Sequence, residues 1–161
     1  MHRRDLLRFS LGASAFLATA SLLGCAPQTP GQGYRVLRDD DLPLLNALVP
    51  VVLAGTAATP EPVLRKLDQA LAALSPEMLK LTRQLFDVLS LPLTRGPLSG
   101  VWGSWESASA AQVEAFLHRW QDSSLNLLRM GHASLLQLLL MAWYATPQAW
   151  PGCGYPGPPR I

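Results

Sequence analysis

The stretch Thr59–Glu77, TPEPVLRKLDQALAALSPE, contains two helix starts with the apolar spacing of a helix between them. Thr59 and Ser75 are residue types that cap helix N-termini, and each is followed by proline and then glutamate, as is typical of a first helical turn. Apolar side chains recur between them every three or four residues, at Val63, Leu64, Leu67, Leu71 and Leu74. The sequence therefore predicts two helices joined by a very short turn.

The same periodicity continues on both sides of this stretch. The acidic run Asp39–Asp41 complements the N-terminus of an opening helix, which Pro50 should kink or shorten because proline lacks a backbone donor. The apolar face of that helix is expected at Leu42, Leu45, Leu48, Val49, Val52 and Leu53. After Ser75 the expected core stripe is Met78, Leu81, Leu85, Val88 and Leu89, with Leu79 and Phe86 on a second face.

The periodicity stops between Pro92 and Ser107, where prolines and glycines predict a loop that carries Trp102 and Trp105. It returns at Val113, Phe116, Leu117 and Trp120. A last helix, from about Leu125 to Tyr144, is apolar around much of its circumference, but its clean apolar part is too short for a membrane span. We expect it to be buried on most sides, in the bundle or under a partner. With no strand pattern, the sequence predicts an all-α bundle of about five helices.

The C-terminal segment 146–161 contains five prolines and three glycines and is expected to form an extended arm. Trp150 and Tyr155 are costly to leave in water, which favours an arm that lies in a groove of this chain or of another protein. Two interpretations stay open for Trp102, Trp105, Trp150 and Tyr155. They cap the core of the bundle, or they anchor another subunit, since tryptophan and tyrosine are enriched where interfaces bind most strongly.

The N-terminus has the three parts of a secretory signal: a charged start, a mildly apolar middle and a small residue before a cleavage point. Arg3-Arg4-Asp5-Leu6-Leu7-Arg8 resembles the twin-arginine (Tat) pattern, with Leu6 where phenylalanine is frequent and Arg8 where lysine is frequent. Leu22-Leu23-Gly24-Cys25 looks like a lipobox, in which Cys25 would be diacylated and become the new N-terminus. The alternatives are an uncleaved signal anchor and a buried helix with chance arginines.

These motifs predict a signal peptide at 1–24, a flexible tether at 25–38 and one helical domain at 39–161. The protein is then periplasmic, recognised by the Tat translocase and tied to a membrane by the acyl chains on Cys25. Without residues 1–24 the chain has ten basic and ten acidic side chains, so nothing suggests nucleic-acid binding. Cys153 has no internal partner if Cys25 is lipidated. We expect a buried thiol or a bond to another chain, and a Cys25–Cys153 disulfide if cleavage occurs elsewhere.

No catalytic constellation is recognisable in the sequence. Beyond the signal the only histidines are His118 and His132, whose spacing does not form a metal pair on one helix, and no cysteine cluster suggests zinc, haem or iron–sulfur binding. Gly100-Val101-Trp102-Gly103 is rich in glycine but lacks the ending that cradles phosphate. The sequence therefore predicts no catalytic residue, no metal and no cofactor in this chain. If the chain were an enzyme, His118, His132 and Glu106 would be the only candidates.

The Tat machinery transports folded proteins, typically because a cofactor must be inserted before export. A helical domain that carries no cofactor has little need of this route, so the signal predicts a cofactor-bearing partner that travels with the chain.

The chain resembles the gluconate 2-dehydrogenase subunit 3 family over most of residues 35–159. The resemblance rests on the opening helix Leu42–Val52, on the segment Arg95–Glu106 (RGPLSGVWGSWE), and on Trp143-Tyr144, Trp150 and the final Gly154–Pro159 (GYPGPP). It implies a Tat-signalled helical small subunit that accompanies a large FAD-dependent dehydrogenase of the glucose-methanol-choline type, with FAD in the partner and electrons passing to a separate acceptor. The small subunit supports maturation and export rather than catalysis. A lipobox is not a regular feature of that family.

The competing class is a free-standing Tat-exported lipoprotein that binds something in the cell envelope.

Overall fold

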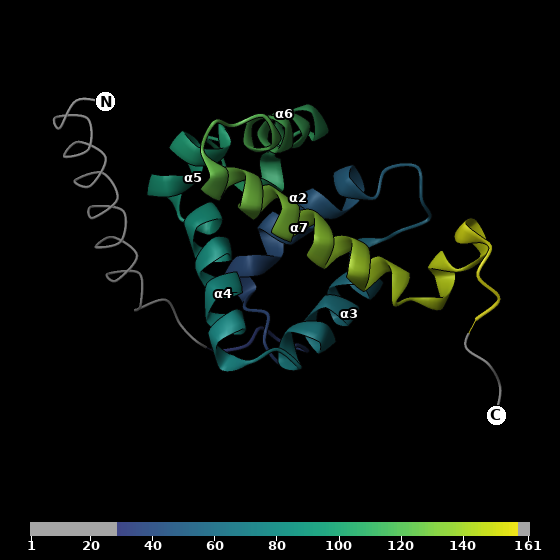
Figure 1. Ribbon diagram of the computed structural model, residues 1–161. Helices are drawn as coiled ribbons and strands as arrows, with labels where there is room; N and C mark the ends of the chain where they lie inside the picture. Colours follow the sequence, from purple (N-terminus) through teal and green to yellow (C-terminus); the bar gives the residue numbers. More distant parts are fainter. Residues whose placement is uncertain (1–28, 158–161) are drawn as a thin grey trace, which may run out of the picture.

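The computed structural model describes residues 29–157 as an all-α fold, and this part of the chain contains no strand (Figure 1). Its α-helices are α2 (Leu42–Val52), α3 (Pro60–Ala72), α4 (Pro76–Ser90), α5 (Pro92–Ser99), α6 (Ala110–Gln121) and α7 (Asn126–Tyr144). Four short 3-10 turns complete it: η2 (Asp39–Asp41), η3 (Trp105–Ser107), η4 (Pro147–Ala149) and η5 (Pro151–Cys153). The predicted fold class is confirmed. The residues of the predicted signal, Arg3, Arg4, Leu6, Leu7 and Cys25, lie outside the described part.

Helix α2 is the centre of the bundle, because it packs against α3, α4, α6, α7 and η3. Its buried side chains are Leu44, Leu45, Leu48 and Val49, and the helix ends at Val52, two residues after Pro50. Pro50 therefore lies in the last turn of the helix, which continues two residues beyond it. Asp41 does not cap α2 as the acidic run suggested, because its carboxylate is buried and accepts hydrogen bonds from Arg38 instead.

Helices α3 and α4 begin where the sequence predicts. Ser75 accepts a hydrogen bond from the backbone N–H of Met78, at 3.3 Å, whereas Thr59 occupies the N-cap position of α3 without such a bond. The predicted face of α3 is confirmed, since Val63, Leu64, Leu67 and Leu71 are buried. The stripe predicted for α4 is only partly correct: Leu89 is buried and Leu85 packs against the core, whereas Met78 and Leu81 are 51% and 58% exposed. Leu79 and Phe86, predicted on a second face, also turn to the core.

Helix α5 lies inside the segment predicted to be a loop. Pro92 occupies the first turn, where its missing N–H costs nothing, and Gly100 ends the helix in the left-handed conformation at φ 82°. A helix of eight residues accommodates its second proline, Pro97, near its end. Proline and glycine therefore mark the two ends of this short helix, and the chain is irregular only after Ser99.

Helix α7 runs across the front of the molecule in Figure 1 and packs against α3 and α6. Its buried residues, Leu135, Leu139, Ala142 and Trp143, form one face, so the prediction that it is buried on most sides is wrong for the chain as it stands. Among residues 29–157, no helix combines the length and the hydropathy that a membrane crossing requires.

Candidate partner-binding surface

Trp102 is the most exposed aromatic residue among those predicted to bind a partner. Gly100 turns the chain so that Val101 is buried at 1% exposure, while Trp102 is 77% exposed. The inner face of the indole ring lies against the backbone of α5, because a Cβ atom at Gly96 would come 2.6 Å from a carbon of the ring. One face of the Trp102 ring thus rests on α5 and the other is open to solvent, which suits a side chain that anchors an interface.

Trp105 follows three residues later and is buried, at 2% exposure. Its indole N–H donates to the backbone carbonyl of Leu89 at 2.7 Å, and its ring meets Phe116 edge-on with centroids 5.6 Å apart. Phe116 in turn meets Trp120 edge-on at 5.0 Å. For Trp105 the prediction of a partner-binding role is therefore wrong, and the alternative of a core residue is correct.

The C-terminal segment extends beyond the helices in Figure 1, but over 147–153 it is wound into η4 and η5 rather than extended as predicted. Its organising residue is Trp150, which is half-buried and donates from its indole N–H to the carbonyl of Tyr144 at 3.1 Å. Tyr155 folds back onto Trp150, with ring centroids 5.5 Å apart and a backbone hydrogen bond of 3.0 Å. Proline and glycine favour these tight turns, and the aromatic pair closes them. The described arm is a small folded unit that leaves Tyr155 47% exposed.

Cys153 is exposed and has a free thiol, which lies 3.3 Å from the carbonyl of Trp150. The expectation of a buried thiol is wrong, because η5 packs on η4 and Trp150 rather than on the bundle. A bond from Cys153 to another chain stays a prediction.

The structure does not bring the predicted anchors together. The loop after α5 lies at one side of the molecule, and the arm lies at the opposite side (Figure 1). Trp102 and the Trp150–Tyr155 pair are therefore two separate aromatic sites.

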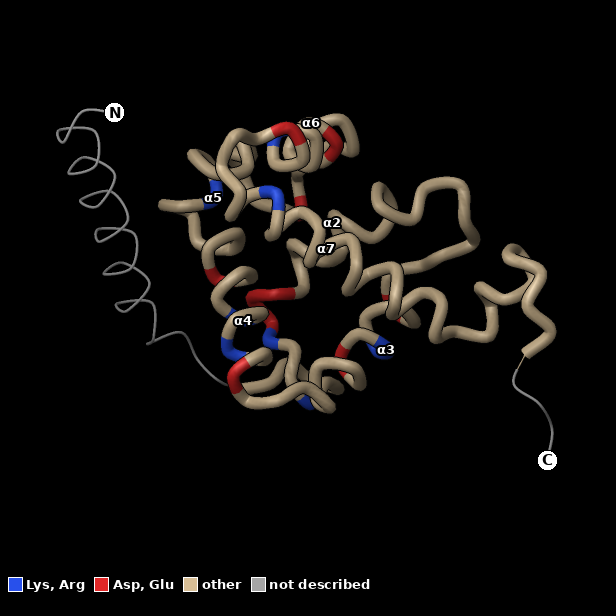
Figure 2. Tube along the Cα trace, in the orientation of Figure 1, with Lys and Arg blue, Asp and Glu red and all other residues tan. Residues whose placement is uncertain are grey.

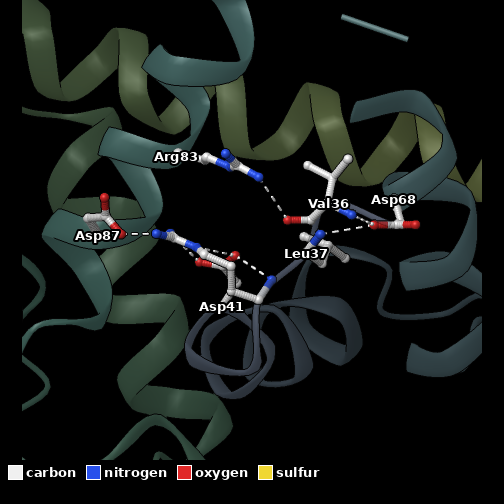
Figure 3. A network of polar contacts seen from close by, with 7 residues as sticks. Val36, Leu37, Asp41, Asp68, Arg83 and Asp87 are labelled. Atoms are coloured by element: carbon white, nitrogen blue, oxygen red, sulfur yellow. Dashed lines mark hydrogen bonds and ion pairs between the residues drawn. The ribbon is translucent and has the colours of Figure 1, made fainter. Parts of the chain in front are cut away.

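A buried polar network, which sequence reasoning missed, fixes the end of the predicted tether (Figure 3). The carboxylate of Asp68, on α3, accepts from the backbone N–H groups of Arg35, Val36 and Leu37 at 2.8–2.9 Å. The carbonyl of Val36 accepts from the guanidinium of Arg83, on α4, at 3.4 Å. Residues 35–38 thus belong to the folded domain rather than to the tether.

Arg38 extends this network through two carboxylates. Its guanidinium pairs with Asp41 at 2.7 Å and with Asp87, on α4, at 2.6 Å, while the Arg38 side chain is almost fully buried. Burial lowers the pKa of Arg38, but the hydrogen bonds and charges of Asp41 and Asp87 outweigh it and raise the pKa above its ordinary value. The charged groups of the network serve the fold, since each carboxylate is committed to a backbone amide or to Arg38.

The enzyme alternative named His118, His132 and Glu106. His118 on α6 and His132 on α7 are close enough to influence each other electrostatically, which their separation in sequence did not suggest. Glu106 lies elsewhere, at a hollow of about 410 Å³ between α2 and η3 that is lined by Leu42, Pro43, Asn46, Ala47, Pro50, Val51, Trp105, Glu106, Ala108 and Ala110. Among residues 29–157 no group of three or more histidine, cysteine or acidic side chains is placed to hold a metal.

Protonation of His132 makes the stability of the folded domain depend on pH. Burial and then the charge of His118 lower the pKa of His132, and the charge of Asp122 opposes them. The unfolded chain therefore takes up the proton at higher pH than the folded chain, so stability is full above about pH 7.5 and falls as pH drops through the ordinary histidine range near 6.5. We expect thermal unfolding to show a smaller loss of Tm between pH 7.5 and pH 5.5 in His132→Gln than in the original protein. An equal loss in both proteins would contradict this account, and Gln121→Ala, an exposed change on α6, serves as the control.

No family model, curated protein or solved structure matches this chain. The resemblance to the gluconate 2-dehydrogenase subunit 3 family therefore rests on the residues quoted above, and the role it implies is a proposal.

Proposed function

We propose that this chain is a non-catalytic small subunit that carries an FAD-dependent dehydrogenase of the glucose-methanol-choline type through the Tat pathway. After export it would hold the assembled oxidoreductase at the periplasmic face of a membrane through lipidated Cys25. The observation that carries the proposal is the pairing of a twin-arginine pattern and a lipobox with a small helical domain. In this assembly FAD belongs to the large subunit.

The small size and simple topology of the helical domain support this role. An all-α domain of this size is dominated by local contacts and folds quickly, so its own folding gives little reason to use a pathway for folded proteins. The most buried charged side chains, Arg38, Asp41 and Asp68, are occupied in holding the segment 35–38. A cargo that requires folding before export is better supplied by a second chain.

The exposed aromatic side chains support a docking role. Trp102 stands on the α5 backbone, and Trp150 and Tyr155 form a separate pair on the arm. Rigid aromatic rings that are already held in place lose little side-chain entropy on binding. Two such sites on opposite sides of a small domain suit a subunit that a larger partner contacts on both sides.

The hollow between α2 and η3 favours a second candidate function, a free-standing lipoprotein that binds a small ligand. Its volume of about 410 Å³ lies within the range of ligand pockets, and its lining is mostly apolar, with Asn46 and Glu106 as polar groups. This candidate predicts export of a single chain, and the following experiment separates the two.

Replacing Arg3 and Arg4 together by lysine should retain the protein in the cytoplasm. On the subunit proposal, a second and larger flavoprotein is retained with it, because the cargo has no signal of its own. Cell fractionation followed by blotting for this chain, and by FAD fluorescence for the flavoprotein, measures both. The matched control is Arg8→Lys, which changes an arginine of the same segment to the residue frequent in the Tat pattern and should leave export intact.

Normal export of every flavoprotein in the Arg3→Lys/Arg4→Lys strain would contradict the subunit proposal. Retention of this chain alone would favour the lipoprotein candidate.

A further inference from the structure

Helix α7 carries a second stripe of residues on the side opposite its buried face. The stripe consists of Leu127, Met130, Ser134, Gln137, Met141 and Tyr144, and all six are exposed. The four large side chains are strongly so: Leu127 is 65% exposed, Met130 57%, Met141 61% and Tyr144 51%. An apolar stripe of about 26 Å, at 1.5 Å per residue, is thus open to solvent in the single chain.

The spacing along this stripe alternates between three and four residues from end to end. Alternation of three and four is the pattern of a helix that packs lengthwise against another helix, with each side chain inserted between side chains of its neighbour. The buried face of α7 does not use this stripe, because Leu135, Leu139 and Ala142 turn to α3 and α6. The pattern therefore suits packing against a second helix that lies outside the bundle.

The order of residue types reads nearly the same in both directions. From either end there is one large apolar or aromatic residue, then a methionine, then a small or amide side chain at the centre. Antiparallel pairing of two α7 helices about a point between residues 135 and 136 places Leu127 opposite Tyr144 and Met130 opposite Met141. The same register places the hydroxyl of Ser134 opposite the amide of Gln137, which satisfies both polar groups at the centre.

Helix α7 itself carries no charged side chain along most of the stripe. The sequence has no lysine, arginine, aspartate or glutamate between Arg129 and Arg160, and Figure 2 shows the C-terminal half of α7 and the segment after it without a charged residue. Arg129 itself is engaged by the carbonyl of Ser123 and the side chain of Asn126. No like charges within the stripe therefore oppose the approach of two α7 helices, and α7 faces outward with no other element in front of it in Figure 1.

The geometry points to a symmetric dimer in which α7 packs antiparallel against α7 of a second copy. A two-fold axis requires a surface that is complementary to itself, and the order of residue types along this stripe meets that requirement. Methionine at the two flanking positions adapts to the contact, as it does at other helix-binding surfaces. One helix pair buries less than the roughly 1,200–2,000 Å² of a standard interface, so the dimer is weak in dilute solution. Confinement of both copies to one membrane raises their effective concentration.

Cross-linking between two differently tagged full-length copies in intact cells tests this contact. One copy carries Ser134→Cys and the other carries Gln137→Cys, both with Cys153→Ser to remove the exposed thiol. The register places the two new thiols opposite each other, so mild oxidation should give a mixed dimer on a non-reducing gel. The matched control is Met78→Cys with Leu81→Cys, which has the same three-residue spacing and similar exposure on α4, and should give at least about fivefold less.

Charge substitutions then test the register. Met130→Glu with Met141→Glu in both copies places like charges opposite each other and should lower the yield at 134/137 at least about fivefold. Met130→Glu with Met141→Lys places opposite charges in the same positions and should retain it. Both pairs remove the same exposed contacts within one chain, those of Asn126 with Met130 and of residue 137 with Met141, so these losses cancel in the comparison. Circular dichroism should show the same helix content in both variants.

A yield at 134/137 no higher than at 78/81 would overturn the dimer, and equal yields in the two charge variants would overturn its register. Cross-linking of α7 only to a different, larger protein would also overturn it, and would assign this face to the partner of the proposed function. Failure of the Tat experiment would remove the membrane confinement, which rests on the proposed function, but the comparison of 134/137 with 78/81 would still test the contact itself.

Discussion

Asp68→Ala is expected to lower the free energy of unfolding by about 3–5 kcal/mol, one of the two largest effects of any single substitution in the described domain. Asp68 is 4% exposed, and its carboxylate accepts hydrogen bonds from the backbone N–H groups of Arg35, Val36 and Leu37. Without it, these donors are left in the interior without an acceptor, and each buried unsatisfied donor costs about 1–3 kcal/mol. The segment 35–38 then loses its hydrogen bonds to α3 and keeps those of Arg38 and of the carbonyl of Val36 to α4.

Urea unfolding followed by circular dichroism measures this effect, with Gln69→Ala as the matched control. Gln69 is the next residue on α3 and is exposed, so its replacement should change stability by less than about 0.5 kcal/mol. Asp68→Asn should fall between the two. An asparagine oxygen can accept from two of the donors, while its NH₂ group meets the third donor without an acceptor. A loss of stability in Asp68→Ala no larger than in Gln69→Ala would show that the carboxylate does not hold the segment.

The second large effect is expected at Trp105. Trp105→Ala removes a buried indole from the contact with Phe116 and leaves the carbonyl of Leu89 without its donor. Truncation of a large buried aromatic residue costs about 3–5 kcal/mol. Trp105→Phe keeps most of the ring and loses the hydrogen bond, for which we expect about 1–3 kcal/mol.

Trp102→Ala is the control for Trp105, from the same loop and with the same change of side chain. Because Trp102 is 77% exposed, its removal should cost less than about 1 kcal/mol of stability. The proposed function adds a second measurement, since Trp102→Ala should weaken co-purification with the flavoprotein while the helix content is unchanged. A stability loss at Trp102 as large as that at Trp105 would remove the distinction between the anchor and the core residue.

Periodicity predicted the parts of the fold in which one apolar stripe dominates. On α3 the residues Val63, Leu67 and Leu71 have no competitor, and their face is buried as expected. On α4 two stripes compete, and the core takes residues from both: Leu89 of the larger stripe is buried, while Met78 and Leu81 of the same stripe are exposed. The smaller stripe faces the core because Phe86 fills it and because Arg83 on that side reaches the carbonyl of Val36.

The polar network was beyond prediction for a different reason. Apart from the Arg38–Asp41 pair, its hydrogen bonds join residues that are 31 to 49 positions apart, and composition shows only a segment with proline and glycine before Asp39. One signal was present: Asp68 lies among Leu64, Leu67 and Leu71, on the apolar face of α3. A carboxylate at such a position requires buried donors, so it indicates that some backbone segment must cross there.

Trp102 and Trp105 show the limit for the candidate site. Both lie in the same segment rich in glycine and serine, and their surroundings in sequence do not differ in a way that predicts exposure. Only the left-handed turn at Gly100, which buries Val101, decides which ring faces the solvent.

The network at residues 35–38 also determines how the domain responds to force. A chain attached to a bilayer at Cys25 is pulled through its N-terminal segment, and any such pull reaches the fold at the three amides held by Asp68 and at Arg38. These bonds connect the segment to α3 and to α4 at once, so the load is divided between two helices instead of peeling one helix away. The joint thus acts as a mechanical clamp between the N-terminal segment and the helices α3 and α4.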